Sequence, residues 1–283
     1  MKLLVLDGYA PDGRKMLRDA GGTDPGPLYA QLLERLADGV QTDIVHPGDP
    51  NPDLPRGPEL EAYDGAVWTG SSLTILRDEE SRVSRQIELA GEILDRGVPS
   101  FGSCWAAQLA AVACGGRCAA NPRGREFGIS RQIRLSSEGR AHPMYAEKSP
   151  VFDAFTSHAD EICQLPEGTA PLASNAFSPV QAIDVTRGRG RFWAVQYHPE
   201  YDAGEVAALC RLRAEELVAQ GVFSDRSSVD RFASGLEILH RDPSTPDLAA
   251  DLGLGDDLLN EQIRTREVAA WLAHEAAPRA ALR

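Results

Sequence analysis

Cys104 stands in a segment whose residue types suit a nucleophile. Small residues flank it in the run Gly102-Ser103-Cys104-Trp105-Ala106, which follows a short apolar stretch and leads into an apolar helical one. A side chain on such a strand-to-helix turn is held at a sharp bend, as in a nucleophile elbow. The positive end of the following helix favours thiolate over thiol. The segment therefore predicts a reactive cysteine, although free cysteines often simply fill space in a core.

A second segment, Tyr197-His198-Pro199-Glu200, supplies the groups that a nucleophilic cysteine needs. In an extended segment residues i and i+2 project to the same side, so His198 and Glu200 can point together. The cysteine needs a base to become a thiolate, and the imidazole needs a carboxylate to fix its tautomer. The two distant segments together predict a catalytic triad of Cys104, His198 and Glu200.

The surrounding elements must bring these two segments together. The first 200 residues alternate short apolar runs with amphipathic stretches, a pattern typical of a mostly parallel sheet covered by helices. Strands or strand-rich stretches are expected at 2–7, 62–70, 98–102, 128–135, 169–185 and 192–200, and helices at 27–38, 82–95, 105–114 and 203–219. We expect an α/β fold, an open and mostly parallel sheet with helices on both faces and the active site at the carboxyl ends of its strands.

The chain is expected to divide at residue 205. Residues 1–205 would form the α/β domain, and residues 206–283 a C-terminal helical extension broken by the proline turn at 242–247. Apolar residues of this extension could pack on the main core or form a docking surface for a partner. They are Leu252, Leu254, Leu258, Leu259, Ile263, Val268 and Trp271.

Composition excludes several classes of function. A formal net charge of −13 opposes binding to nucleic acid or to an anionic bilayer. The apolar run in Met1–Tyr9 is too short for a signal peptide, and no segment approaches the roughly 20 apolar residues of a membrane span. Five cysteines without CxxC pairs, and histidines without ligand spacing, argue against disulfides and a metal site. We expect a cytoplasmic protein without bound metal.

Two longer segments carry a resemblance to a known family. FGSCWAAQLAAVACGG at 101–116, taken with AVQYHPE at 194–200, resembles the class I glutamine amidotransferases. Weaker matches support it at WTGSS (68–72), REFG (125–128), SHAD (157–160) and SNAFSPVQAI (174–183). The resemblance covers about residues 1–205, and it implies a flavodoxin-like open sheet and no cofactor for the glutaminase step.

The resemblance also implies roles for particular residues. Cys104 would attack the side-chain amide of glutamine and form a γ-glutamyl thioester, with His198 as the general acid and base and Glu200 as its orienting partner. Gln108, four residues after Cys104 on the same helix face, matches a glutamine-binding position. The backbone of Trp105, with that of the Gly70-Ser71 turn, would form the oxyanion hole.

Three further features leave alternatives open. Ser157 and His158 match positions that contact bound glutamine, but His158 could instead cap a turn. Ala106 and Ser72 depart from the family pattern, which has glycine and proline there, so the pocket could be reshaped. The basic residues Arg123, Arg125 and Arg131 could meet an anionic substrate or partner, or could form a solvated face.

Three functions are compatible with these residues. The first is a glutamine amidotransferase that passes ammonia to an acceptor on a separate protein, because the chain has no GxxxxGK[ST] loop and too few residues after 205 for an ATP-binding domain. The second is a stand-alone γ-glutamyl amide hydrolase, and the third a catalytically weak scaffold or regulatory subunit. The expected substrate is glutamine or another γ-glutamyl amide.

Overall fold

A computed structural model describes residues 1–282 and contains one large mixed sheet. Its strand order is β2-β1-β3-β4-β11-β10-β9-β6-β7, and β5 and β8 form a separate two-stranded ribbon. The strands are β1 (Lys2–Leu6), β2 (Gln41–Val45), β3 (Gly65–Trp68), β4 (Ser100–Ser103), β5 (Arg117–Ala120), β6 (Glu126–Leu135), β7 (Val151–His158), β8 (Asp160–Gln164), β9 (Ala173–Ser174), β10 (Ala182–Arg187) and β11 (Gly190–Val195).

The strands that carry the predicted triad are parallel. β1 pairs in parallel with β2 and β3, and β4 pairs in parallel with β3 and β11. Beyond β11 the sheet continues through antiparallel pairs out to β6 and β7. Because β4 and β11 are parallel neighbours, their carboxyl ends meet at one edge, and Val195 lies opposite Ser103. The chain thus places Cys104 beside the Tyr197–Glu200 segment.

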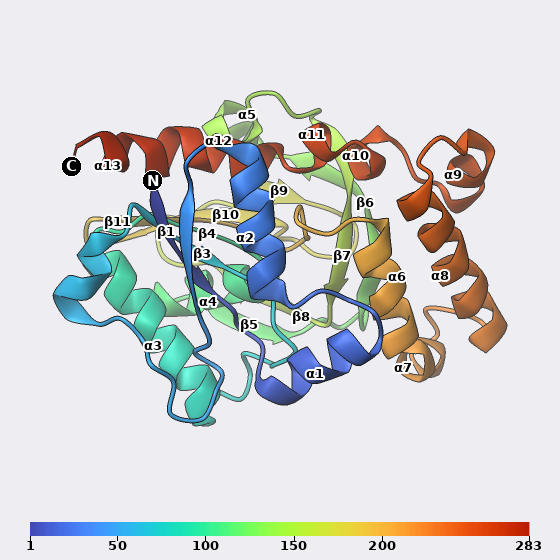
Figure 1. Cartoon of the computed structure of the whole chain (residues 1–283), viewed down its shortest axis with the longest axis horizontal. Coiled ribbons are helices and arrows are strands. Elements are labelled where there is room, and N and C mark those ends of the chain that lie inside the picture. Colours follow the sequence, from blue (N-terminus) through green and yellow to red (C-terminus); the bar gives the residue numbers. More distant parts are fainter. Residues whose placement is uncertain (283) are drawn as a thin grey trace.

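Helices cover both faces of this sheet, as expected (Figure 1). The α-helices are α1 (Pro11–Asp19), α2 (Pro25–Leu36), α3 (Ser81–Asp95), α4 (Trp105–Ala113), α5 (Ser137–Ala141), α6 (Ala203–Leu212), α7 (Ala214–Ala219), α8 (Arg226–Arg241), α9 (Pro246–Leu252), α10 (Asp256–Leu259), α11 (Glu261–Arg264), α12 (Arg266–Trp271) and α13 (Ala277–Ala281). The 3₁₀ helices are η1 (Gly57–Ala62) and η2 (Pro143–Tyr145), and η3 (Leu272–Ala276) is a π-helical segment.

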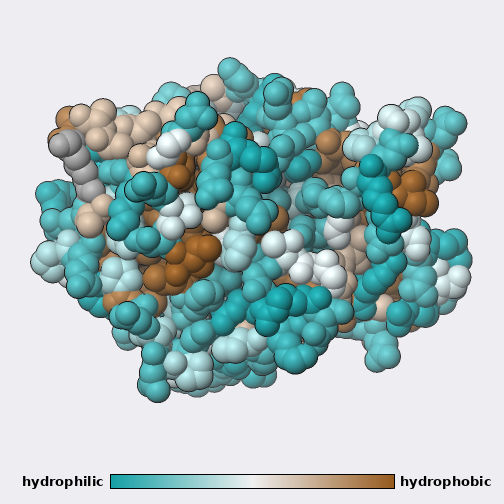
Figure 2. All heavy atoms as spheres, viewed as in Figure 1, coloured by the Kyte–Doolittle hydropathy of each residue, from teal (hydrophilic) through white to brown (hydrophobic). Residues whose placement is uncertain are grey.

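Alternation along β1 explains the two layers of helices. Leu4 and Leu6 belong to the core cluster that α3 and α4 cover, whereas Leu3 and Val5 belong to the cluster beneath α2 and α12. Successive side chains of a strand point to opposite faces, so a wholly apolar strand implies a sheet buried on both sides. Hydrophilic residues cover most of the outer face shown in Figure 2, with apolar side chains in small patches.

The C-terminal region is helical and packs onto the sheet. Trp271 is fully buried, and its ring lies 6.0 Å from that of Phe101 between centroids. A Cβ atom added to Gly65 would come within 2.7 Å of this indole, so β3 needs glycine there. Val268 and Trp271 therefore pack in the main core. Of the two alternatives for these residues, core packing and a docking surface, the structure shows core packing. The division at residue 205 stays a prediction.

Most expected elements are present, with shifted ends. The helix expected at 27–38 is Pro25–Leu36, and that at 82–95 is Ser81–Asp95. The expectation of one helix over 203–219 was wrong, because Arg213 leaves the helical path and separates α6 from α7 without a glycine or proline. Among residues 1–282, none of the helices combines the length and the hydropathy that a membrane span requires.

Candidate active site

Cys104 lies on a strained turn between β4 and α4. Its φ of 54° and ψ of −99° are unusual for a residue with a side chain, and such strain costs roughly 1–3 kcal/mol. Gly102 makes the close approach possible, because a Cβ atom there would come within 2.3 Å of the Ala106 Cβ and 2.6 Å of the Trp68 carbonyl oxygen. The elbow therefore forms with Ala106 at the position where the family pattern has glycine.

His198 and Glu200 lie together at the end of β11. The Nδ1 atom of His198 is 2.7 Å from Oε1 of Glu200, and both side chains are 2% exposed. The His198 backbone N–H donates to the carbonyl of Phe155 at 2.8 Å, and Tyr201 stacks on the imidazole with centroids 3.9 Å apart and planes 3° from parallel. The structure thus fixes the ring through Nδ1, and none of these contacts uses Nε2.

Electrostatic contacts favour the protonated form of His198. Burial alone would lower the pKa of this imidazole, but the charge of Glu200 and then interactions with Cys104 raise it to about 10. The raised pKa favours the protonated ring at neutral pH. This charge state suits a thiolate–imidazolium pair, in which the ring can give a proton to a leaving group.

Glu200 is held by two hydroxyl groups from other elements. Ser103 Oγ donates to Oε1 at 2.7 Å, and the hydroxyl of Tyr29 in α2 lies 2.8 Å from Ser103 Oγ and 3.2 Å from Oε2. Burial first, and then the charge of Glu200, raise the pKa of Tyr29 well above its ordinary value, so the phenol stays a donor. Neither contact was predicted from the sequence.

The residues expected to form the oxyanion hole lie near His198 and at the wall of the cavity that contains Cys104. A Cβ atom added to Gly70 would lie 2.9 Å from Cε1 of His198, so this turn approaches the imidazole closely. The next residue, Ser71, fixes the turn by donating from Oγ to the carbonyl of Gly8 at 2.7 Å. Trp105 is the first residue of α4, a position whose backbone N–H has no partner within the helix.

A cavity of about 150 Å³ opens at Cys104. Its walls come from the 71–74 turn, from the start of α4, from the 157–160 segment and from two arginines, and the residues are Ser71, Ser72, Leu73, Thr74, Cys104, Trp105, Gln108, Arg125, Ser157, His158, Ala159, Asp160 and Arg213. Gln108 lines it while its Nε2 donates to the carbonyl of Asp160 at 3.1 Å. The Cys104 thiol donates to the carbonyl of Ser157 at 3.6 Å. The cavity thus unites the expected substrate-binding residues.

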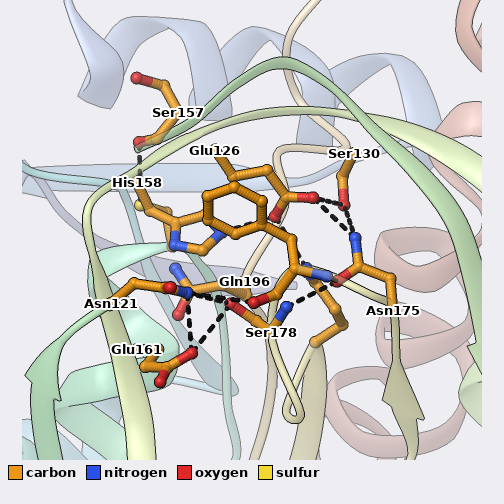
Figure 3. A network of polar contacts seen from close by, with 12 residues as sticks. Asn121, Glu126, Ser130, Ser157, His158, Glu161, Asn175, Ser178 and Gln196 are labelled. Carbon is orange, nitrogen blue, oxygen red and sulfur yellow. Dashed lines mark hydrogen bonds and ion pairs between the residues drawn. The ribbon is translucent and has the colours of Figure 1, made fainter. Parts of the chain in front are cut away.

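His158 lies beside Glu126 in a network of polar contacts (Figure 3), and both of its ring nitrogens have partners within the protein. Nε2 lies 2.8 Å from Oε2 of Glu126, and Nδ1 lies 3.0 Å from the carbonyl oxygen of Asp160. Both partners offer acceptor oxygens, so the protein occupies both ring nitrogens. Burial raises the pKa of Glu126, but hydrogen bonds from His158, Asn175 and Ser130 bring it below its ordinary value. The imidazole thus links Glu126 at the start of β6 to the 158–160 turn. It fixes this turn and also lines the cavity wall, so turn capping and substrate contact are both compatible with its place.

Sequence reasoning missed Tyr29, Tyr201 and Arg213. Tyr201 had a weak signal, since it follows the His-Pro-Glu segment directly. Tyr29 is 171 residues from Glu200, and no local pattern links them. Within residues 1–282 no group of three or more histidine, cysteine or acidic side chains is placed to hold a metal ion, and all five cysteines are free.

This fold and arrangement are those of an α/β enzyme, and comparisons with known proteins identify its family. The family model described as "Glutamine amidotransferase class-I" matches residues 69–210. The chain is 32% identical over 285 residues to a γ-glutamyl-L-1-hydroxyisopropylamide hydrolase from a Pseudomonas species, covering 99% of this chain and 95% of that protein. The chain belongs to the class I glutamine amidotransferase family, and it is an enzyme.

Other relatives match in part. The chain is 30% identical over 193 residues to the GMP synthase [glutamine-hydrolyzing] of Nitrosomonas eutropha, which covers 62% of this chain but 33% of that protein. The chain thus spans about a third of such relatives. A crystal structure of a glutamine amidotransferase from Thermotoga maritima has a TM-score of 0.63 and 18% identity, covering 95% of this chain and 98% of the other. That likeness shows the same fold.

Proposed function

We propose that this protein is a stand-alone hydrolase of γ-glutamyl amides. The observation that carries the proposal is the position of Cys104 at the cavity, beside a charged His198 that Glu200 holds. The similarity to a γ-glutamyl-L-1-hydroxyisopropylamide hydrolase supports this substrate class, because it runs through the C-terminal region as well as through the family domain.

The proposed reaction proceeds by two acyl transfers. The thiolate of Cys104 attacks the γ-carbonyl carbon, and backbone N–H groups of Trp105 and the Gly70-Ser71 turn stabilise the oxyanion. The C–N bond then breaks as the nitrogen takes a proton from Nε2 of His198, which releases the amine and leaves a thioester. Water gives a proton to His198 and attacks the thioester, and the C–S bond breaks, which releases glutamate and returns Cys104 as the thiolate and His198 as the imidazolium.

The remaining cavity residues would bind the γ-glutamyl group. Gln108, Ser157 and His158 lie in the wall next to Cys104, where a substrate acyl chain would extend. The protein holds Nε2 of Gln108 and both ring nitrogens of His158, so these residues would shape the pocket with their neighbouring backbone more than with free side-chain donors. We propose the cytoplasm as the compartment, since a reducing environment keeps such cysteines free.

Steady-state hydrolysis tests the proposal. Glutamate release would be measured with glutamine, with γ-glutamyl isopropylamide and with γ-glutamyl hydroxyisopropylamide, using wild type, Cys104→Ala and the exposed-cysteine control Cys163→Ala. We expect a higher kcat/KM for an alkylamide than for glutamine. Cys104→Ala should lose turnover, whereas Cys163→Ala should keep it. The absence of glutamate from every γ-glutamyl amide would contradict the proposal.

A second candidate is glutamine hydrolysis coupled to an ammonia acceptor. The partial similarity to GMP synthases favours it, and in this candidate the ammonia acceptor would lie on a separate protein. The same assay separates the two functions. Glutamine would be the preferred substrate, and a partner protein from the native organism would increase its turnover.

A further inference from the structure

Two arginines line the cavity that contains Cys104. Arg125 precedes β6, and Arg213 occupies the break between α6 and α7. Their side chains are 11% and 20% exposed, so neither is an ordinary surface group. Burying cationic groups beside an active cysteine is unfavourable unless negative charge compensates them.

The protein supplies one compensating carboxylate for the two cations. Nη2 of Arg125 donates to Oε1 of Glu216 at 2.9 Å, and Nη1 of Arg213 donates to Oε2 of the same residue at 2.9 Å. Asp160 adds a further carboxylate to the cavity wall, where it accepts from the hydroxyl of Thr74 at 2.6 Å rather than from either arginine. The bridged trio of Arg125, Arg213 and Glu216 therefore keeps one net positive charge.

The two guanidinium groups also keep unused donors. Nε of Arg125 and Nε of Arg213 are buried without a hydrogen-bond partner among residues 1–282. The pKa of Arg125 lies below its ordinary value, first because of burial and then because of repulsion from Arg213. Burial raises the pKa of Glu216, but the two arginines bring it below its ordinary value. A second anion beside the arginines would relieve their repulsion.

A neighbouring cavity extends this positive region. It has a volume of about 500 Å³, shares Arg125 with the first cavity, and is also lined by Arg123 and Arg131. Arg123 donates to the carbonyl of Phe177 at 3.3 Å, while Arg131 pairs with Asp153 at 2.7 Å. The basic cluster seen in the sequence thus borders a hollow that has Arg125 in common with the active-site cavity. A substrate that extends past Arg125 would enter a positive environment.

Resting on the proposed function, we propose that Arg125 and Arg213 form a carboxylate subsite of the active-site cavity, held in place by Glu216. A guanidinium fork matches a carboxylate in two parallel hydrogen bonds, which suits this ligand. The carboxylate is either the α-carboxylate of the γ-glutamyl group or one carried by the leaving amine. Arg213 and Glu216 lie outside residues 69–210, so the subsite uses residues beyond the part that the family model matches.

Two matched pairs of substrates distinguish these sources. Glutamine and 4-aminobutanamide differ by the α-carboxylate, whereas γ-glutamylglycine and γ-glutamylmethylamide differ chiefly by a carboxylate on the leaving amine. We expect wild type to prefer the carboxylate-bearing member of at least one pair, and Arg213→Ala to lose about tenfold or more of that preference. Arg125→Ala should act in the same direction, and Arg213→Lys should restore part of the preference.

The matched control is Arg226→Ala, which removes an exposed arginine that pairs with Asp230 at 3.0 Å on α8. This variant should keep both preferences. Circular dichroism and thermal unfolding of each variant identify any that fails to fold. Unchanged preferences in folded Arg213→Ala and Arg125→Ala would overturn the subsite.

Binding to Cys104→Ala separates this inference from the proposed reaction. Calorimetry would compare glutamine and γ-glutamylglycine on Cys104→Ala with and without Arg213→Ala. A rise in Kd of about tenfold for either ligand supports the subsite even if wild type hydrolyses nothing, an outcome in which the proposed function alone fails. If wild type hydrolyses the substrates but Arg213→Ala leaves both Kd values unchanged, the proposed function stands and the subsite is overturned.

Discussion

The two charged groups beside Cys104 differ in how completely the protein satisfies them. Glu200 receives hydrogen bonds from His198, from Ser103 and from the Tyr29 hydroxyl, all buried. Arg125 and Arg213, on the other hand, share one carboxylate and keep buried N–H groups without partners. A fully satisfied group is preorganised for chemistry, whereas an unsatisfied one is suited to receive a ligand. Under the two proposals, the comparison separates a carboxylate that holds the imidazole from arginines that would bind part of the substrate.

Loss of the thiol is expected to have the largest effect. Cys104→Ala should lower kcat by roughly 10⁶-fold for every substrate, because both acyl transfers need the sulfur. Stopped assays of glutamate release would measure the loss, and Cys163→Ala provides a matched control with an exposed cysteine. Residual turnover within tenfold of wild type would place the nucleophile elsewhere.

Glu200→Gln tests the satisfied side of the comparison. It should lower kcat by roughly 10⁴-fold, because a neutral amide neither fixes the imidazole tautomer nor stabilises the imidazolium.

The pH dependence of Glu200→Gln should also differ from that of wild type. In wild type, kcat/KM should fall as the pH rises through about 10, where His198 loses the proton that the leaving amine needs. Without the Glu200 charge the pKa of His198 is lower, so in Glu200→Gln the fall in kcat/KM should occur at lower pH. If the fall stays at the same pH, a group other than His198 causes it.

Much of this satisfied side could be predicted from the sequence, and much of the arginine side could not. Cys104, His198 and Glu200 lie in two short segments whose spacing and strand context carry the signal. The link between Arg125 and Glu216 spans 91 residues and depends on a helix break at Arg213 that neither glycine nor proline announces. A continuous helix over 203–219 was expected, so the residue pattern offered no reason to place Arg213 at a helix break beside the cavity. Strand β7 was likewise missed, because Val151–His158 shows no clean apolar alternation.

A smaller effect is expected where the backbone approaches the imidazole. Gly70→Ala would place a Cβ atom 2.9 Å from Cε1 of His198 and push the ring away from Cys104. A misplacement of about 1 Å costs roughly 10²-fold in kcat. Gly255→Ala is the matched control, since an added Cβ atom there meets nothing within 4 Å. Equal kcat values for the two variants would show that Gly70 does not set the ring position.

The smallest effect should come from Tyr29→Phe. The change removes one hydroxyl near Ser103 and Glu200 and leaves the histidine contact intact. We expect kcat to fall about tenfold and the free energy of unfolding to drop by about 1–2 kcal/mol, from one lost buried hydrogen bond. Urea unfolding and kcat measured on the same preparation check both values. A 10⁴-fold loss would give Tyr29 a role equal to that of Glu200.

Mass spectrometry of an acyl-enzyme tests the central claim most directly. Wild type would be mixed with a γ-glutamyl alkylamide, quenched in acid within the first turnovers and digested for peptide mapping. The account predicts one γ-glutamyl group on the peptide that contains Cys104, released by hydroxylamine and absent from Cys104→Ala. A γ-glutamyl group on another residue, or turnover that persists in Cys104→Ala, would contradict it.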